Sequence, residues 1–195
     1  EINRETYDHF NEENLTFKAE LGINEAIVRE ISRHKQEPEW MLKKRLEGFR
    51  LFNEISLPTW GPSLEKLDLS QIYFFMRPDA KKNAESWDDV PEDIKKTFDK
   101  LGIPEAEKHA LSGVGAQYES EVIYHKLKKE WEDQGVVFLD CDEAVKQYPE
   151  LVKKYFMTQC VPINLHKFVA LHAAVWSGGT FLYVPQGVKI DLPLQ

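Results

Sequence analysis

The stretch INEAIVREISRHKQEPEWMLKKRLEGFRLFN, residues 23–53, decides the first part of the fold. Apolar residues recur at i, i+4, i+5 and i+8 in this stretch, as Ile23, Ile27, Val28 and Ile31. This spacing places them on one face of a helix, and Asn24 is suited to cap that helix. Pro38 is tolerated in a first helical turn, and the apolar pattern then continues to about Asn53. The sequence therefore predicts two helices in tandem.

The middle of the chain predicts short, mixed elements after a loop over residues 56–70 that contains PTWGPS. The repeat of Ile123, Leu127 and Trp131 predicts the longest helix, from about Tyr118 to Gln134. The other expected elements are a strand over 71–76, a helix from Pro91 stopped by Gly102, a short helix from Pro104, a strand over 136–139, a helix capped by Asp142 up to Tyr148, and one from Pro149 to Met157.

The charge pattern changes near residue 155. The chain has 25 lysine and arginine and 33 aspartate and glutamate residues, but only Lys167, Lys189 and Asp191 lie beyond residue 154. The apolar run KFVALHAAVW, the turn at Gly178 and the segment TFLYVP are typical of strands. In VKIDL, residues 188–192, strict alternation places Val188, Ile190 and Leu192 on one buried face. Strands that end with the chain leave an uncovered edge, so the expected β structure is truncated.

Composition excludes several classes of protein. A net charge of −8 is the wrong sign for binding a phosphate backbone, and 30% charged residues argue against a membrane protein. Two cysteines cannot supply a disulfide framework, which favours a reducing compartment. No secretory leader is visible, but residue 1 is glutamate, so the expectation is a cytoplasmic protein, or a plastid one if a transit peptide has been removed.

Cys160, His166 and His172 are the candidate metal ligands, because thiolate and imidazole bind iron or zinc. Their spacing matches no standard motif, so packed cysteine and structural histidine are the favoured interpretation. Glu121 and His125, one turn apart on the predicted long helix, form a weaker pair, since carboxylate-bridged bundles need a second copy.

No catalytic motif emerges from the remaining residues. Gly113 and Gly115 lack the third glycine and preceding strand of a phosphate loop, and no Walker lysine or G-x-S-x-G elbow is present. The acidic run from Asp88 to Asp93 is interpreted as a helix start. The five tryptophans, at positions 40, 60, 87, 131 and 176, are interpreted as core and interdomain packing. These observations favour a scaffold or interaction role over an enzyme.

Five segments resemble one known family. They are EISRHKQEPEWML at 30–42, PTWGP at 58–62, SWDDVPEDIKKTFDKLGIPEAE at 86–107, GVGAQYESEVIYH at 113–125 and AVWSGGTFLYVPQGVKIDLPLQ at 174–195. Together they resemble the SufB scaffold family of SUF iron-sulfur cluster assembly. The related SufD family shares the later β region, whereas EPEWML and SWDDVP are more similar to SufB.

The resemblance implies an α+β fold: an N-terminal, mostly helical domain over residues 1–165, followed from 166 to 195 by the first strands of a right-handed parallel β-helix, here truncated. It also implies a C-terminal helical segment, beyond Gln195, that docks the SufC ATPase. A solenoid with so few coils cannot complete its core.

The functional implications of the resemblance concern a longer protein. It would work without enzymatic activity of its own, with SufC, SufD and a sulfur donor of the SufE or SufU type, receiving mobilised sulfur and iron and building a cluster. The family's sulfur acceptor and cluster ligands lie beyond Gln195, and neither Cys141 nor Cys160 matches them. This chain is therefore expected to bind no cluster. The alternative is an interaction module that docks SUF partners without binding a cluster.

Overall fold

The computed structural model describes residues 15–79, 87–100, 113–118, 120–191, 193 and 194. The chain forms two compact units, and each is assembled from separated stretches of sequence. The first unit comprises Glu1–Thr16, Arg77–Asp140 and Gly178–Gln195, and the second comprises Phe17–Met76 and Cys141–Ser177. The boundary predicted between residues 165 and 166 from charge and resemblance thus falls inside the second unit.

The second unit begins with the two predicted helices, which are confirmed as α1 (Glu25–Lys35) and α2 (Glu39–Glu54). The side chain of Asn24 accepts a hydrogen bond of 2.9 Å from the backbone N–H of Ile27, as a helix cap does. Gln36 ends α1 in the left-handed conformation, and Pro38 precedes α2. Local sequence signals therefore determine where both helices begin and end.

The apolar run at 167–175 forms α8 (Lys167–Val175), so the strand pattern predicted there is wrong. Ala170, Ala173 and Ala174 are fully buried, and alanine is the strongest helix former. Apart from Lys167 and His172 the residues of α8 are apolar, so the helix has little amphipathic period, which is why its sequence resembled a buried strand. The helix α8 lies along α2, where Gly48 has no side chain and lets the two backbones approach closely.

Two shorter helices complete the second unit. The helices predicted over 142–148 and 149–157 are confirmed as α6 (Cys141–Gln147) and α7 (Pro149–Tyr155), with Pro149 in the first turn of α7. Asp142 does not cap α6 from outside as predicted, because it lies within the first turn. Its carboxylate instead accepts a hydrogen bond from a distant lysine.

The strands β1 (Leu15–Lys18) and β2 (Met76–Pro78) pair as a two-stranded sheet. The strand predicted over 71–76 is therefore wrong for residues 71–75, because only Met76 of that stretch belongs to β2. Gln71 belongs to a short 3-10 turn, and Tyr73 forms only an isolated antiparallel bridge with Leu21.

The largest correction concerns the predicted helix over 118–134, which belongs to the first unit. The chain there forms an antiparallel hairpin of β3 (Gly113–Tyr118) and β4 (Glu121–Leu127), and only α5 (Lys129–Glu132) is helical. Val122, Ile123 and Tyr124 are β-branched or aromatic and favour a strand. The four-residue repeat was fortuitous, because Leu127 and Trp131 reach one core from a strand and from a helix.

A second antiparallel pair joins distant parts of the first unit. The strand β5 (Val137–Asp140) confirms the strand predicted at 136–139, and it pairs with β6 (Thr180–Tyr183), whose sequence also carried strand signals. The segment VKIDL is not a regular strand among its described residues, 188–191. Val188 and Ile190 nevertheless pack against buried Leu127, Trp131, Val136 and Phe138, as their alternation predicted, and Leu192 lies outside the described residues.

The remaining helix, α3 (Glu92–Lys100), confirms the prediction from Pro91, whereas Gly102 and the helix expected from Pro104 lie outside the described residues. The described structure is thus α+β with antiparallel strand pairs. A parallel β-helix stays a prediction for a longer chain. In the ranges that the structure describes, no helix is both long and apolar enough to cross a membrane.

Candidate functional site

The three predicted metal ligands lie in the second unit, after α7. Cys160 is exposed in the loop between α7 and α8, His166 immediately precedes α8, and His172 lies in its last turn. Among the residues that the structure describes, no group of three or more histidine, cysteine, aspartate or glutamate side chains is arranged to hold a metal ion. The structure therefore does not assemble Cys160, His166 and His172 into a metal centre, and a ligand role for them stays a hypothesis.

His166 is surrounded by aromatic rings. The Trp60 ring meets it edge-on with centroids 5.6 Å apart, and the Phe168 ring lies 6.2 Å away. Its Nδ1 atom is buried and has no hydrogen-bond partner within the described part of the chain. These contacts are those of a packed histidine at the start of a helix.

His172 lies close to a buried positive charge. Its partial burial and then the positive charge of Arg45 lower the pKa of His172 below its usual value. The imidazole is therefore neutral at neutral pH, but the neighbouring guanidinium also repels a metal cation.

The other predicted candidates do not form a site. Glu121 and His125 lie on β4 rather than on a helix, and their side chains lie outside what the structure describes. Gly113 and Gly115 belong to β3, which leads into a second strand instead of a helix N-terminus. Asp88 lies in a short 3-10 turn before α3, and its carbonyl accepts a hydrogen bond of 3.1 Å from Lys95 Nζ, consistent with a role at the start of a helix.

The tryptophans divide between core and surface. Trp131 and Trp176 are buried, as predicted. Trp60 is not, because 67% of its surface is exposed. Trp40 is half-buried, and the side chain of Trp87 lies outside the described residues.

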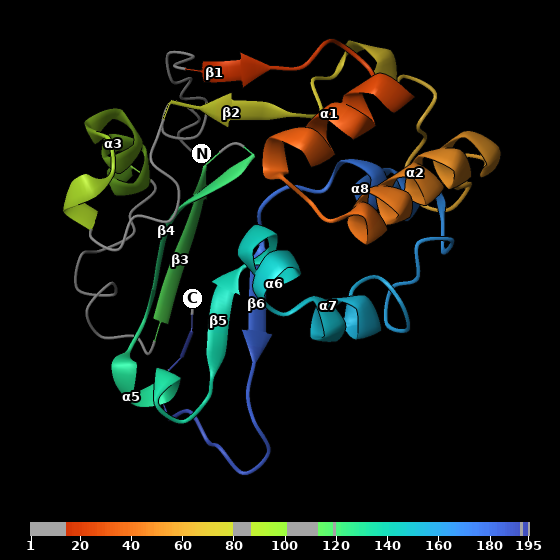
Figure 1. The fold of residues 1–195 in the computed structure, drawn as a ribbon. Coiled ribbons are helices and arrows are strands. Elements are labelled where there is room, and N and C mark those ends of the chain that lie inside the picture. Colours follow the sequence, from red (N-terminus) through yellow and green to blue (C-terminus); the bar gives the residue numbers. More distant parts are fainter. Residues whose placement is uncertain (1–14, 80–86, 101–112, 119, 192, 195) are drawn as a thin grey trace. The chain divides into compact units, whose positions relative to one another are not determined.

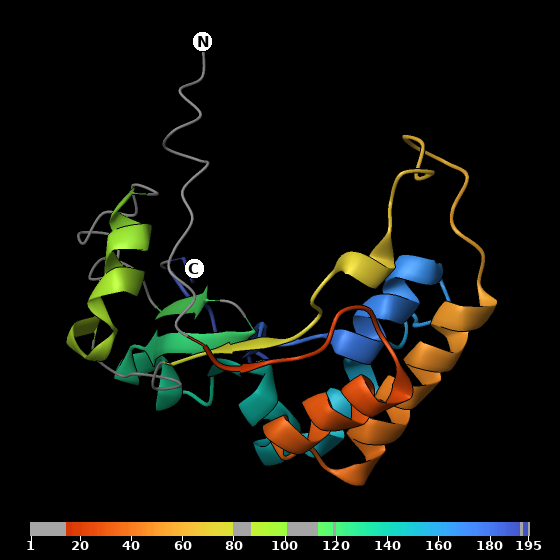
Figure 2. The same ribbon diagram turned by 90° about the horizontal axis from the view of Figure 1, so that it is seen from above.

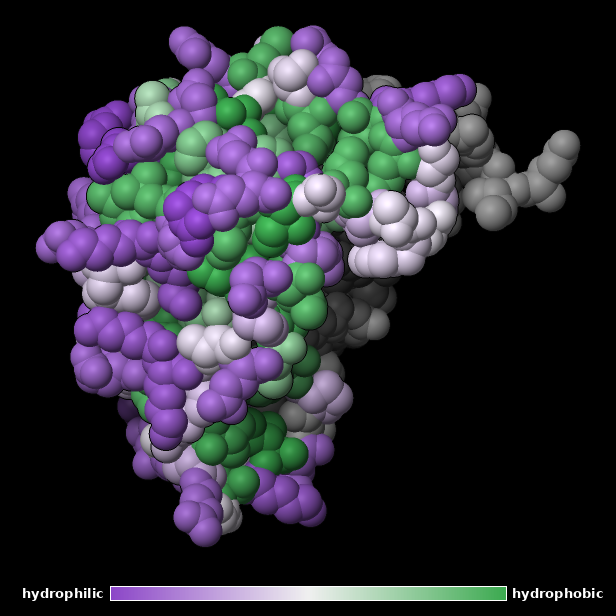
Figure 3. All heavy atoms as spheres, turned by 90° about the vertical axis from the view of Figure 1, so that its right-hand side faces the viewer, coloured by the Kyte–Doolittle hydropathy of each residue, from purple (hydrophilic) through white to green (hydrophobic). Residues whose placement is uncertain are grey.

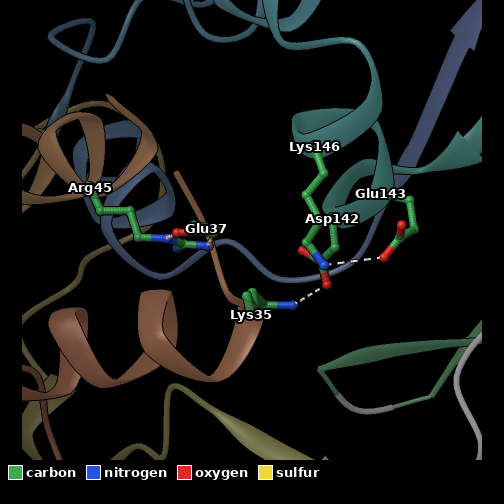
Figure 4. Close-up of polar contacts among 6 residues, drawn as sticks. All are labelled: Lys35, Glu37, Arg45, Asp142, Glu143 and Lys146. Carbon is green, nitrogen blue, oxygen red and sulfur yellow. Dashed lines mark hydrogen bonds and ion pairs between the residues drawn. The ribbon is translucent and has the colours of Figure 1, made fainter. Parts of the chain in front are cut away.

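The polar centre that the sequence analysis missed lies inside the second unit (Figure 4). Lys35, in the last turn of α1, donates a hydrogen bond to Oδ2 of Asp142 in the first turn of α6, and both side chains are buried. Each charge also lies at the helix end whose dipole it complements. Removal of two charges from water is costly unless they pair, so this contact requires α1 and α6 to meet.

Arg45 and Glu37 form the second half of this centre. The guanidinium donates from Nε to Glu37 Oε2 at 2.7 Å and from Nη2 to Oε1 at 2.6 Å, a bidentate pair. Its Nη1 donates to the carbonyl oxygen of Ala174 at 3.1 Å, and its Cζ atom lies 4.6 Å from the ring centroid of Trp176. The Arg45 side chain is fully buried, so one residue joins α2 to the end of α8.

Three cationic side chains in this unit bind the carboxyl ends of other helices. Arg45 binds Ala174 at the end of α8, and Lys44 Nζ donates to the carbonyl of Phe156 after α7 at 3.0 Å. Lys167 Nζ donates to the carbonyls of Phe52 and Ile55 at the end of α2, the latter at 3.0 Å. Because unpaired carbonyls and the negative end of the dipole lie there, these contacts stabilise the helix packing.

The arrangement is suited to holding helices together. Glu37 and Asp142 each face a buried cation, so their charge is already compensated inside the unit. A sequence signal for this centre existed. Lys35 continues the apolar stripe of Ile27 and Ile31 at a spacing of four, and Arg45 follows Met41 at the same spacing. Charged residues on the buried face of a helix predict partners elsewhere in the fold.

Comparison with known proteins gives a consistent result. The sequence pattern of the family described as SufBD protein N-terminal region matches residues 26–195. Iron-sulfur cluster assembly SufBD family proteins of Staphylococcus saprophyticus and Staphylococcus haemolyticus are each 51% identical over 189 residues, which is 97% of this chain and 40% of the relative. A protein of Staphylococcus aureus with the same description is 50% identical over the same lengths. The chain thus spans about 40% of the length of these curated relatives.

Proposed function

This chain belongs to the SufBD family, and we propose that it serves iron-sulfur cluster assembly as the N-terminal part of a longer SufBD protein. The observation that carries the proposal is the family match over residues 26–195, together with relatives that are named for this assembly process. The structure adds that the buried charges of the second unit are paired with one another, as expected for a region whose task is structural.

Within the family, we propose a SufB type rather than a SufD type. The basis is the sequence of two segments, EPEWML at 37–42 and SWDDVP at 86–91, which are more similar to SufB. In this proposal the longer protein is a scaffold without enzymatic activity, and the ATPase activity belongs to the partner SufC. The other partners are SufD and a sulfur donor of the SufE or SufU type, and the setting is the cytoplasm.

The iron-sulfur cluster is the cargo of this scaffold. We place the residues that receive sulfur and hold the cluster in the remainder of the longer protein, which we propose to continue after α8 as a right-handed parallel β-helix. The present chain contributes the helical region that precedes it.

Anaerobic reconstitution tests the proposal. The 195-residue chain and a longer version with the relatives' full length would each be incubated with iron and sulfide, or with SufC and a sulfur donor. Visible absorbance and iron content would be measured. We expect cluster formation on the longer protein alone. If the longer protein accumulates no iron and sulfide under any of these conditions, the scaffold role is wrong.

A pair of cysteine variants tests the remaining hypothesis, in which Cys160 and nearby histidines bind a metal. If the 195-residue chain binds stoichiometric iron and Cys160→Ser lowers the bound iron while Cys141→Ser does not, the site is Cys160 with its histidines. Unchanged metal content in Cys160→Ser removes that hypothesis.

The second candidate function is a docking module for SUF partners, and the charge distribution favours it. By sequence, the stretches of the first unit carry 21 acidic and 12 basic residues, whereas those of the second carry 12 acidic and 13 basic. The net negative charge therefore belongs to the first unit, which favours association with a basic surface. A pull-down with SufC, SufD and the sulfur donor at low and high salt tests this. No binding by a folded chain would contradict it.

A further inference from the structure

Two segments of the second unit contain no charged residue, in a chain that is 30% charged. They are residues 55–63, ISLPTWGPS, and residues 156–166, FMTQCVPINLH. Four large apolar side chains on them are exposed: Leu57 at 41%, Trp60 at 67%, Val161 at 47% and Leu165 at 58%. We refer to these four residues as the Trp60 surface.

The two segments are held next to each other by contacts at the start of α8. Lys167 binds the carbonyls of Phe52 and Ile55 where the first segment begins. The Trp60 ring contacts His166 at the end of the second segment, with centroids 5.6 Å apart. Trp60 and His166 therefore bring the first segment and the end of the second segment together, at the end of α2 and the start of α8.

The loop that carries Trp60 is stiffened by its sequence. Pro58 and Pro62 fix the backbone on either side of the tryptophan, which lowers the entropy lost when the loop is covered. Figure 2 shows residues 56–67 extending away from α2 and α8. A tryptophan presented in this way is the side chain most often found at the centre of a protein interface.

The chemistry of the Trp60 surface indicates what covers it. Figure 3, which looks onto the side where α2 lies, shows hydrophobic and near-neutral residues between the hydrophilic ones. A surface without charges offers no steering to a separate, diffusing partner, and it leaves a charged partner desolvated and unpaired. It is suited to an apolar segment that is already tethered, since tethering raises the effective concentration of the segment.

We propose that, in SufBD proteins of the relatives' length, the polypeptide that follows this N-terminal region covers the Trp60 surface. The inference rests on the proposed function, which makes the chain part of such a protein. The matched region is only 40% of each relative, and the family pattern describes an N-terminal region, so most of the additional chain follows it. That chain is long enough to return to the surface.

Cys160 provides a reporter, because it is exposed and lies next to Val161. The rate of alkylation by N-ethylmaleimide would be measured at this residue by peptide mass spectrometry, in the 195-residue chain and in the longer protein, both with a chelator present. We expect Cys160 to react freely in the shorter chain and about tenfold more slowly in the longer one, independently of protein concentration.

A substitution links the protection to the surface itself. In the longer protein, Trp60→Ala should restore most of the Cys160 reactivity. Leu21→Ala removes another exposed apolar side chain of the second unit, outside both segments, and should leave the protection unchanged. Circular dichroism melts of both variants would verify that the helices remain folded.

Other outcomes overturn the inference. Equal reactivity in both chains means that the additional polypeptide does not cover the surface, and slow reactivity in the shorter chain means that the chain covers it by itself. Protection that increases with protein concentration identifies a second copy, and protection only after addition of SufC, SufD or the sulfur donor identifies a separate partner. Because alkylation requires no cluster, a failed reconstitution would leave this result interpretable.

Discussion

Lys35 and Asp142 are 107 residues apart in the sequence and form a buried ion pair between α1 and α6 of the second unit. A buried pair contributes little when compared with two apolar residues, but loss of one partner leaves the other charge unpaired away from water. The pair therefore acts mainly as a requirement that the two segments of this unit meet in one arrangement.

Replacement of only one partner should be strongly destabilising. We expect Lys35→Met to lower the free energy of unfolding by about 3–5 kcal/mol, because the Asp142 carboxylate stays buried without its cation. The double variant Lys35→Met with Asp142→Leu should recover much of that loss. Urea denaturation of the single and double variants measures both effects.

An exposed pair on α2 is the matched control. Lys43 Nζ lies 2.9 Å from Glu39 Oε1, and both side chains are mostly exposed. Lys43→Met should therefore change the stability far less than Lys35→Met. Comparable losses in the two variants would contradict the role assigned to burial.

Arg45 should not be replaceable by lysine. The ammonium of Arg45→Lys retains the charge but cannot form the two parallel bonds to Glu37 while also binding Ala174 and stacking on Trp176. We expect a loss of about 1.5–3 kcal/mol, the range for hydrogen bonds to charged groups. Thermal denaturation measures it. Arg50→Lys, in an exposed pair on the same helix, should be nearly silent, and an equal effect at both positions would refute the interpretation.

Gly48→Ala should destabilise the second unit despite the higher helix propensity of alanine. An added Cβ would lie 2.8 Å from Ala173 Cβ and 2.9 Å from the carbonyl oxygen of Ala170. Overpacking of this kind costs about 1–3 kcal/mol, against about 1 kcal/mol gained from propensity. Chemical denaturation gives the net value, and Ala173→Gly in the same chain should relieve part of the strain. A more stable Gly48→Ala protein would show that α2 and α8 can separate at no cost.

His172 should make the stability of the protein depend on pH. Burial and Arg45 lower the pKa of His172 in the folded state, so the unfolded state, with a pKa of about 6.5, binds more protons. The stability contributed by the neutral imidazole is therefore complete above pH 6.5 and decreases as the pH falls toward the folded-state value. Melting temperatures between pH 7.5 and pH 5 should fall more steeply in the wild type than in His172→Gln. An NMR titration that places the His172 pKa at or above 6.5 would contradict this.

Much of the local structure was predictable from short sequence signals. Asn24 and Pro38 marked the starts of α1 and α2, and Pro149 marked the start of α7. Such signals act within one helical turn, through a side chain that caps the backbone or a ring that fixes it. They do not depend on what the element later packs against.

The spacing of apolar residues gave the wrong element in two places, where the same pattern fits both a helix and a strand. The repeat of Ile123, Leu127 and Trp131 fitted a helix, but the hairpin of β3 and β4 places Leu127 in the same core as Trp131. The run at 167–175 fitted a strand, but it forms α8, which buries Ala170, Leu171, Ala173 and Ala174 and has few polar residues. In both cases the hydrophobic period alone did not distinguish helix from strand, although the β-branched and aromatic residues of β4 and the alanines of α8 favour the observed element.

The sequence by itself determined the starts of α1, α2 and α7, the scarcity of charge in the later segments and, through its resemblance, the family. Only the tertiary structure decided that 167–175 is a helix, that β5 pairs with β6 across the 39 residues between Asp140 and Thr180, and that Lys35 meets Asp142. The physical reason is the range of the interactions. Caps and turns are satisfied by neighbours in the chain, whereas a buried charge or an apolar helix is stable only beside a partner that the fold supplies.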